Sequence, residues 1–155
     1  MIGAAVLDEA TVRAALAGVL DPEIPVVSVV DLGMVETVDV EADRIRVEML
    51  PTFIGCPALD LIRDSVVGRL AGFGRPVEVD FGFRVPWSSD RITDEGREKL
   101  RRSGFAPPTA DLTATRCPYC GSANIALDNL FGPTQCRSLF YCRGCRQPFE
   151  GFKTL

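Results

Sequence analysis

The chain has 155 residues, of which 46% are hydrophobic and 25% are charged, as is typical of a globular protein. No apolar run approaches the ~18 to 20 residues that a membrane-spanning helix requires. Histidine is absent, which excludes His-based catalytic triads, imidazole general bases and nearly all catalytic zinc sites. Residues 1–111 carry 12 Lys or Arg against 19 Asp or Glu, whereas residues 112–155 carry 5 against 2. An acidic main domain argues against nucleic-acid binding and favours protein partners.

The first half of the chain predicts a helix, a loop and a hairpin. Asp8 can cap a helix whose apolar positions recur at helical spacing up to Leu20, and Asp21-Pro22 would end it. The proline-rich stretch that follows predicts an acidic loop. Residues 34–40 and 44–50 form extended runs, and apolar side chains alternate with charged ones in the second run. That alternation predicts a hairpin with one buried face.

A second helix is expected after Cys56 and Pro57, because proline favours the first position of a helix and an apolar stripe follows it. Residues 77–81 alternate as a third strand. The last expected helix begins at Thr93, with acidic residues in its first turn and basic residues in its last, and ends before Gly104.

The order of these elements predicts an α+β domain over residues 1–105, in which a small three-stranded sheet packs with helices. Residues 106–111 include two consecutive prolines and predict a linker. Residues 112–155 have few large apolar side chains for a core. We therefore expect a zinc-ribbon-like module at the carboxyl end, whose fold is stabilised by a bound metal.

That module holds two C-x-x-C motifs at the spacing of a four-thiolate metal site, formed by Cys117, Cys120, Cys142 and Cys145. Zinc prefers four tetrahedral ligands and thiolate sulfur suits it, although the same ligands can hold an iron ion or an iron-sulfur cluster. The alternative is two unrelated pairs of buried cysteines. Cys136 is a surplus thiol, either a buried apolar side chain or an extra ligand of the tail site.

Cys56 stands alone in the first domain, where the start of a helix can lower the pKa of its thiol. Thr52 can donate a hydroxyl hydrogen bond into the same turn. We expect Asp21, Glu23 and Asp31 to line the opening of the site around Cys56 and to assist the release of a metal. The alternatives are that Cys56 packs as a small hydrophobic side chain and that Asp21 only caps a turn.

Three motifs resemble the SufT-like (MIP-eighteen-like) iron-sulfur assembly domain: Asp21-Pro22-Glu23, Asp31-Leu32-Gly33 and the T-x-x-x-C-P pattern from Thr52 to Pro57. The stretch Val85-Pro86-Trp87, the Cys117-Pro118-Tyr119-Cys120 motif and Phe131-Gly132-Pro133-Thr134-Gln135-Cys136 are similar to one branch of that family, the PaaD-type accessory proteins of bacterial phenylacetyl-CoA epoxidase systems. This similarity spans nearly the whole chain. It implies that Cys56 is the reactive cysteine of the family, and it also includes a cysteine at the position of Cys136.

The resemblance implies a non-catalytic factor that helps to mature the iron-sulfur or metal centres of a multicomponent oxygenase in phenylacetate breakdown. Its partners would be the oxygenase or reductase subunits and the iron-sulfur assembly machinery. The cofactors would be a structural zinc, or iron in the same site, and a transient iron-sulfur cluster. A lone thiolate also allows a cluster to bridge two copies in a homodimer. Without a basic secretory leader, we expect the protein in the cytoplasm.

Two other functions remain open at this point. One is a rubredoxin-like redox carrier, in which one iron in the four-thiolate site delivers electrons to the oxygenase. The other is a zinc-ribbon nucleic-acid binder that uses the arginines of the tail, Arg116, Arg137, Arg143 and Arg146, but the acidic main domain argues against it.

Overall fold

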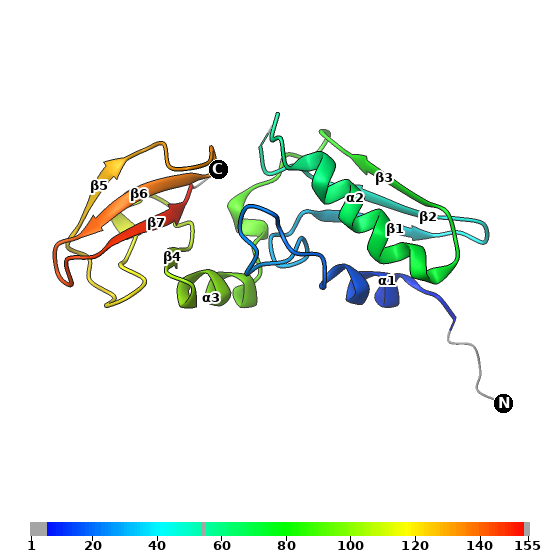
Figure 1. Cartoon of the computed structure of the whole chain (residues 1–155), viewed down its shortest axis with the longest axis horizontal. Helices are drawn as coiled ribbons and strands as arrows, with labels where there is room; N and C mark the ends of the chain where they lie inside the picture. Colours follow the sequence, from blue (N-terminus) through cyan, green and yellow to red (C-terminus); the bar gives the residue numbers. More distant parts are fainter. Residues whose placement is uncertain (1–5, 54, 154–155) are drawn as a thin grey trace.

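A computed structural model describes residues 6–53 and 55–153. The molecule is elongated, with two units side by side along its long axis (Figure 1). One unit holds a three-stranded sheet of order β1-β2-β3, and the other holds a four-stranded sheet of order β4-β7-β6-β5. Over the part of the chain that is described, no helix has the length and apolar character needed to cross a membrane.

The first sheet confirms the predicted hairpin and third strand. Strand β1 (Val35–Val40) pairs antiparallel with β2 (Ile45–Met49), and β2 pairs parallel with β3 (Val77–Phe81). Helix α2 (Leu59–Leu70) connects β2 to β3 and covers the sheet (Figure 1). The apolar side chains of β2, at every second position, are buried in the core, as predicted. The apolar stripe of α2 belongs to the same core.

Helix α1 (Glu9–Leu16) is shorter than predicted, although Asp8 caps it by accepting a hydrogen bond from the backbone of Thr11. The backbone N–H of Val19 bonds to the carbonyl of Leu16, which is the tight geometry of a helix end. The chain then turns away, because Leu20 forms a β-bridge with Ser28 and the N–H of Val29 donates to Val19. Pairing with the following loop therefore ends this helix before Asp21-Pro22.

Helix α3 (Asp94–Arg102) begins at the predicted cap, where the Thr93 hydroxyl accepts a hydrogen bond from the N–H of Gly96 at 3.0 Å. Strand β4 (Phe105–Ala106) follows directly and pairs in parallel with β7 (Pro148–Phe152). Ala106, the first residue of the predicted linker, thus lies in the ribbon sheet. The described residues also contain three 3-10 turns: η1 (Ala71–Phe73), η2 (Ser89–Arg91) and η3 (Leu112–Ala114).

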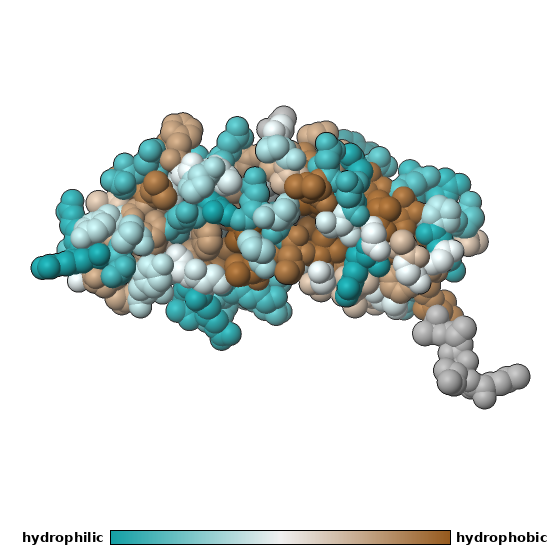
Figure 2. Space-filling view, viewed as in Figure 1, coloured by the Kyte–Doolittle hydropathy of each residue, from teal (hydrophilic) through white to brown (hydrophobic). Residues whose placement is uncertain are grey.

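The ribbon contains β5 (Ile125–Asn129) and β6 (Arg137–Cys142), with antiparallel pairing from β5 through β6 to β7. Its own small core includes the stacked rings of Phe140 and Phe149, whose centroids are 5.2 Å apart. The two units also share a core, since the rings of Trp87 and Phe152 lie 5.8 Å apart. On the side of the molecule drawn in Figure 2, apolar side chains gather toward the middle, where the two units meet. The ribbon is therefore docked on the α+β domain by apolar packing.

Candidate functional site

The structure brings the four cysteines of the two C-x-x-C motifs together, as predicted. The sulfur atoms of Cys117, Cys120, Cys142 and Cys145 all lie within 4.8 Å of one another. Cys117 Sγ and Cys145 Sγ are 3.7 Å apart, and Cys120 Sγ and Cys142 Sγ are 3.6 Å apart. With zinc–sulfur bonds of about 2.3 Å, the sulfurs of a tetrahedral site lie about 3.8 Å apart. The donor set therefore fits a structural zinc or an iron ion of the same coordination.

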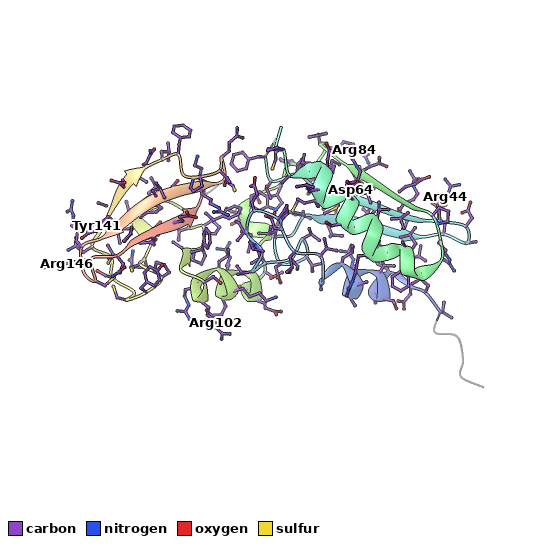
Figure 3. The ribbon with its side chains drawn as sticks, viewed as in Figure 1. Arg44, Asp64, Arg84, Arg102, Tyr141 and Arg146 are labelled. Atoms are coloured by element: carbon purple, nitrogen blue, oxygen red, sulfur yellow. The ribbon has the colours of Figure 1, made fainter. Side chains whose placement is uncertain are left out.

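Two tight turns hold these ligands. The N–H of Gly121 donates to the carbonyl of Cys117 at 2.8 Å, and Gly121 has a φ of 74°, which glycine adopts freely. In the second turn the N–H of Cys145 donates to Cys142 Sγ. This hydrogen bond and the neighbouring cysteine side chains outweigh burial and lower the pKa of Cys142 to about 7. The turn between β6 and β7 lies at the outer end of the molecule, where Arg146 is labelled in Figure 3. The metal site thus closes the ribbon at the end that faces away from the α+β domain.

Cys136 lies outside the tail site, so the prediction of an extra tail ligand is wrong, whereas the alternative of a buried thiol is confirmed. Among the described residues, the only group of three or more potential ligands at metal-binding distance contains the other four ribbon cysteines. Cys136 instead belongs to the core of the α+β domain and is 8% exposed. Its sulfur lies 3.8 Å from Glu23 Oε2 and 3.1 Å from Thr134 Oγ1. Cys136 is therefore a buried core residue whose sulfur also has two polar neighbours.

The acidic loop holds Glu23 toward Cys136 of the ribbon. The carboxylate of Asp21 accepts hydrogen bonds from the N–H groups of Glu23 at 2.8 Å and of Ile24 at 2.9 Å. This is the turn-capping role that we had considered for Asp21, and it explains why an Asp precedes Pro22. The carbonyl of Glu23 also accepts from the Arg137 guanidinium of the ribbon. Asp21 therefore positions the loop, and Glu23 is the acidic residue that reaches the candidate site.

A cavity of about 320 Å³ contains Cys56 and Cys136 together. Its wall on the α+β domain is formed by Thr52, Phe53, Cys56 and Pro57, with Glu23 from the acidic loop. The opposite wall is residues 131–136 of the ribbon, in the loop between β5 and β6. Three of the stretches that the resemblance singled out thus meet at one place, although they lie far apart in the sequence.

The pKa of Cys56 is raised, which is opposite to our prediction. Burial of the thiol raises its pKa most, the backbone at Ala58 lowers it, and the carboxylates of Glu23 and Asp21 raise it further. Helix α2 begins at Leu59, so Cys56 lies three residues before the helix and only part of the expected amide stabilisation is present. Burial and two nearby carboxylates outweigh it. Without a cation this site holds a neutral thiol.

Asp31 is placed away from the cavity, contrary to our expectation. Its carboxylate accepts from the N–H of Ser28 and pairs with Lys99 Nζ of α3, both at 2.9 Å. Its carbonyl accepts from the N–H of Thr93, the cap of α3. The other two residues of the motif make similar contacts: the carbonyl of Leu32 accepts from Trp87 Nε1, and the carbonyl of Gly33 accepts from Arg91 Nε. The D-L-G motif is therefore a structural junction.

The same two parts of the chain match two known domain families. Residues 9–81 match the model of an iron-sulfur cluster assembly protein, and residues 105–153 match the PaaD zinc beta ribbon domain. A protein of Escherichia coli named as a putative subunit of 1,2-phenylacetyl-CoA epoxidase is 35% identical over 149 residues, which cover 92% of this chain and 90% of the relative. The chain belongs to the PaaD family.

Other relatives match a smaller share of this PaaD-family chain. The Fe-S protein maturation auxiliary factor of Porphyromonas gingivalis is 40% identical over 86 residues, which are 53% of this chain and 80% of the relative. A domain of unknown function from Bacillus anthracis has a TM-score of 0.56 at 30% identity, and the match covers 59% of this chain and 90% of that domain. A conserved hypothetical protein from Thermotoga maritima has a TM-score of 0.53 at 29% identity, with 61% and 94% covered.

Proposed function

We propose that this PaaD-family chain is an accessory factor that matures the iron-sulfur or other metal centre of a phenylacetyl-CoA epoxidase. Cys56 accepts the iron cargo and passes it to the client, while the tail cysteines hold a structural zinc. The oxygenase or reductase subunits are the clients, and the iron-sulfur assembly machinery is the source. The observation that carries this proposal is that Cys56 lies in an open cavity beside a carboxylate, whereas the tail thiolates enclose their site.

The contrast between the two sites supports a division of labour. A closed four-thiolate site exchanges its metal slowly and supplies folding energy, which suits a structural role. A thiol in a cavity with few other donors holds a metal less completely, which suits transfer. The match of residues 9–81 to the iron-sulfur assembly model favours transfer at Cys56 over catalysis.

The test is to co-express the epoxidase subunits with the wild-type chain, with Cys56→Ser and with Asp64→Asn as a control. Asp64 is exposed on α2 (Figure 3) and lies outside the cavity. We expect Cys56→Ser to lower the iron content and the activity of the purified epoxidase while leaving its own fold and zinc content unchanged. Full client iron and activity with Cys56→Ser would refute the proposal.

A redox carrier is the second candidate, and the exposure of Cys120 at the tail site favours it, because electron transfer needs a metal ligand near the surface. In that case the tail would hold iron, and the protein would be red and would bleach on reduction. A colourless protein with one zinc in the tail excludes the carrier.

A further inference from the structure

Two thiols from different units of the chain face the same cavity. Cys56 lies in the turn before α2, and its N–H donates to the carbonyl of Phe53 at 3.4 Å. Cys136 lies 80 positions further along the chain, immediately before β6. Both line the cavity of about 320 Å³ that also holds the Glu23 carboxylate. The ribbon therefore adds the thiol of Cys136 to the cavity in which the α+β domain places Cys56.

The backbone around Cys136 is held firmly by the ribbon. The carbonyl of Cys136 accepts from the N–H of Lys153 at 2.8 Å, and the N–H of Arg137 donates to the carbonyl of Thr134 at 3.2 Å. Lys153 Nζ also lies 4.6 Å from the centre of the Phe131 ring, which is part of the cavity wall. The loop thus places the sulfur at a defined point.

Arg137 fixes the position of this loop against the α+β domain. Its guanidinium donates to the carbonyl of Glu23 and pairs with Glu150 of β7 at 3.0 Å, and its side chain is only 13% exposed. The neighbouring residue Cys136 is consequently held with its sulfur next to the carboxylate of Glu23. The contact joins the two units through the acidic loop.

The charges around both thiols favour a bound cation. Cys136 Sγ lies 3.8 Å from Glu23 Oε2, and the same carboxylate lines the cavity with Cys56. Two thiolates beside carboxylates would repel one another, so the ionised form of the site needs a positive partner. Sulfur and carboxylate donors together suit iron.

We propose that Cys56 and Cys136 form a second, two-domain metal site with Glu23 as an additional ligand, and that this site holds the iron cargo. Each thiol gives its proton to solvent when it ligates the metal. The site rests on the proposed function, because that function supplies the iron. The cargo is thiolate-bound iron, either a single ferrous ion or a small iron-sulfur cluster.

The separation of the donors bears on which cargo is bound. Cys56, Cys136 and Glu23 do not all lie within the 4.8 Å that joins the tail sulfurs. A single ion would require the cavity walls to draw together, whereas a cluster offers ligand positions on more than one iron. Titration with ferrous ion alone and reconstitution with iron plus sulfide separate these two cargoes.

The experiment uses the full-length, zinc-loaded chain under anaerobic conditions, with zinc occupying the tail site. Wild type, Cys56→Ser, Cys136→Ser and Glu23→Gln are titrated with ferrous ion, or reconstituted with iron and sulfide. Bound iron and the thiolate-to-iron absorption are measured. Gln135→Ala is the control, because Gln135 lines the same cavity without a thiol or carboxylate. Zinc content and thermal unfolding confirm that each variant is folded.

We expect wild type and Gln135→Ala to bind iron equally, and each cysteine variant to bind it about 10-fold or more weakly. A double variant with both Cys56→Ser and Cys136→Ser should bind iron little more weakly than either single cysteine variant, because both thiols serve one site. Iron binding by Cys136→Ser that matches wild type would overturn the two-domain site. Normal client maturation with Cys56→Ser would instead refute the proposed function, so the two failures are distinguishable.

Discussion

Cys136 Sγ of the ribbon lies 3.8 Å from Glu23 Oε2 of the α+β domain. This contact joins the motif that begins at Phe131 to the Asp21-Pro22-Glu23 loop. The ribbon therefore has two ends with different tasks: its outer end encloses the four-thiolate site, and its inner end completes the wall of the cavity around Cys56.

Replacement of Arg137 by Met should loosen the junction between the two units. Arg137 pairs with Glu150, donates to the Glu23 carbonyl and lies 5.0 Å from the centre of the Phe105 ring. Its Nε is buried without a partner among the described residues. The loss of unfolding free energy on replacement should therefore be smaller than for a buried charge with all its hydrogen bonds made. We expect about 2 kcal/mol of lost stability by chemical denaturation.

The matched control for that change is Arg143→Met, because Arg143 is exposed at the outer end of the ribbon. Its replacement should change the free energy of unfolding by less than about 0.5 kcal/mol. Equal effects of the two substitutions would contradict the role of Arg137 in holding the two units together.

Gly33→Ala should destabilise the protein more than Gly74→Ala. Both glycines have positive φ, 66° and 72°, so both substitutions strain the backbone, by about 1 kcal/mol. A Cβ at Gly33 would also overlap the backbone carbonyl of Arg91, whereas nothing lies within 4 Å of one at Gly74. We expect at least about 2 kcal/mol more loss at Gly33, measured as unfolding free energy. Similar losses would show that the junction with Arg91 adapts.

Asp31→Asn should remove stability at neutral pH but not in acid. Burial disfavours the charged form of Asp31, but the Ser28 N–H and Lys99 outweigh it and lower its pKa below 3.8. A lowered pKa stabilises the folded state above the unfolded-state value, and this contribution is lost as the pH falls through the folded-state pKa. Wild type should therefore exceed Asp31→Asn in unfolding free energy at pH 7, and the gap should close in acid. A gap that stays constant with pH would contradict the ion pair with Lys99.

Cys117→Ser should release the tail metal and disorder the ribbon. The Cys117 side chain is 2% exposed and contributes one of the four sulfurs, and structural zinc supplies folding free energy directly. The α+β domain should remain folded, because its own three-stranded sheet and buried core do not depend on the tail metal. Two-dimensional NMR and zinc analysis test this, with Cys136→Ser as a control that keeps its zinc. A zinc-free variant with an ordered ribbon would contradict it.

Local patterns in the sequence predicted the parts of the fold that depend on local forces. The alternation in residues 44–50 and the apolar stripe ending at Leu70 each correspond to a strand or helix with one buried face. The C-x-x-C spacing predicted the tail site because each motif is a local turn. Helix α1 was predicted too long, since its end is set by the bridge from Leu20 to Ser28.

The cavity could be predicted only in part. Cys56, Thr52 and Glu23 were identified from motifs, but the placement of Cys136 beside them depends on how the ribbon docks. That docking relies on Arg137 and on the contact between Trp87 and Phe152, which join positions more than 60 residues apart. The pKa of Cys56 was predicted in the wrong direction because burial and Glu23 are tertiary effects.

The most direct test of the central claim is the metal content of wild type and Cys56→Ser, both purified anaerobically from cells that make the iron-sulfur assembly machinery. The account predicts one zinc per chain in both proteins and iron only in wild type. Equal iron in the two proteins, or iron in place of zinc at the tail cysteines, would contradict it.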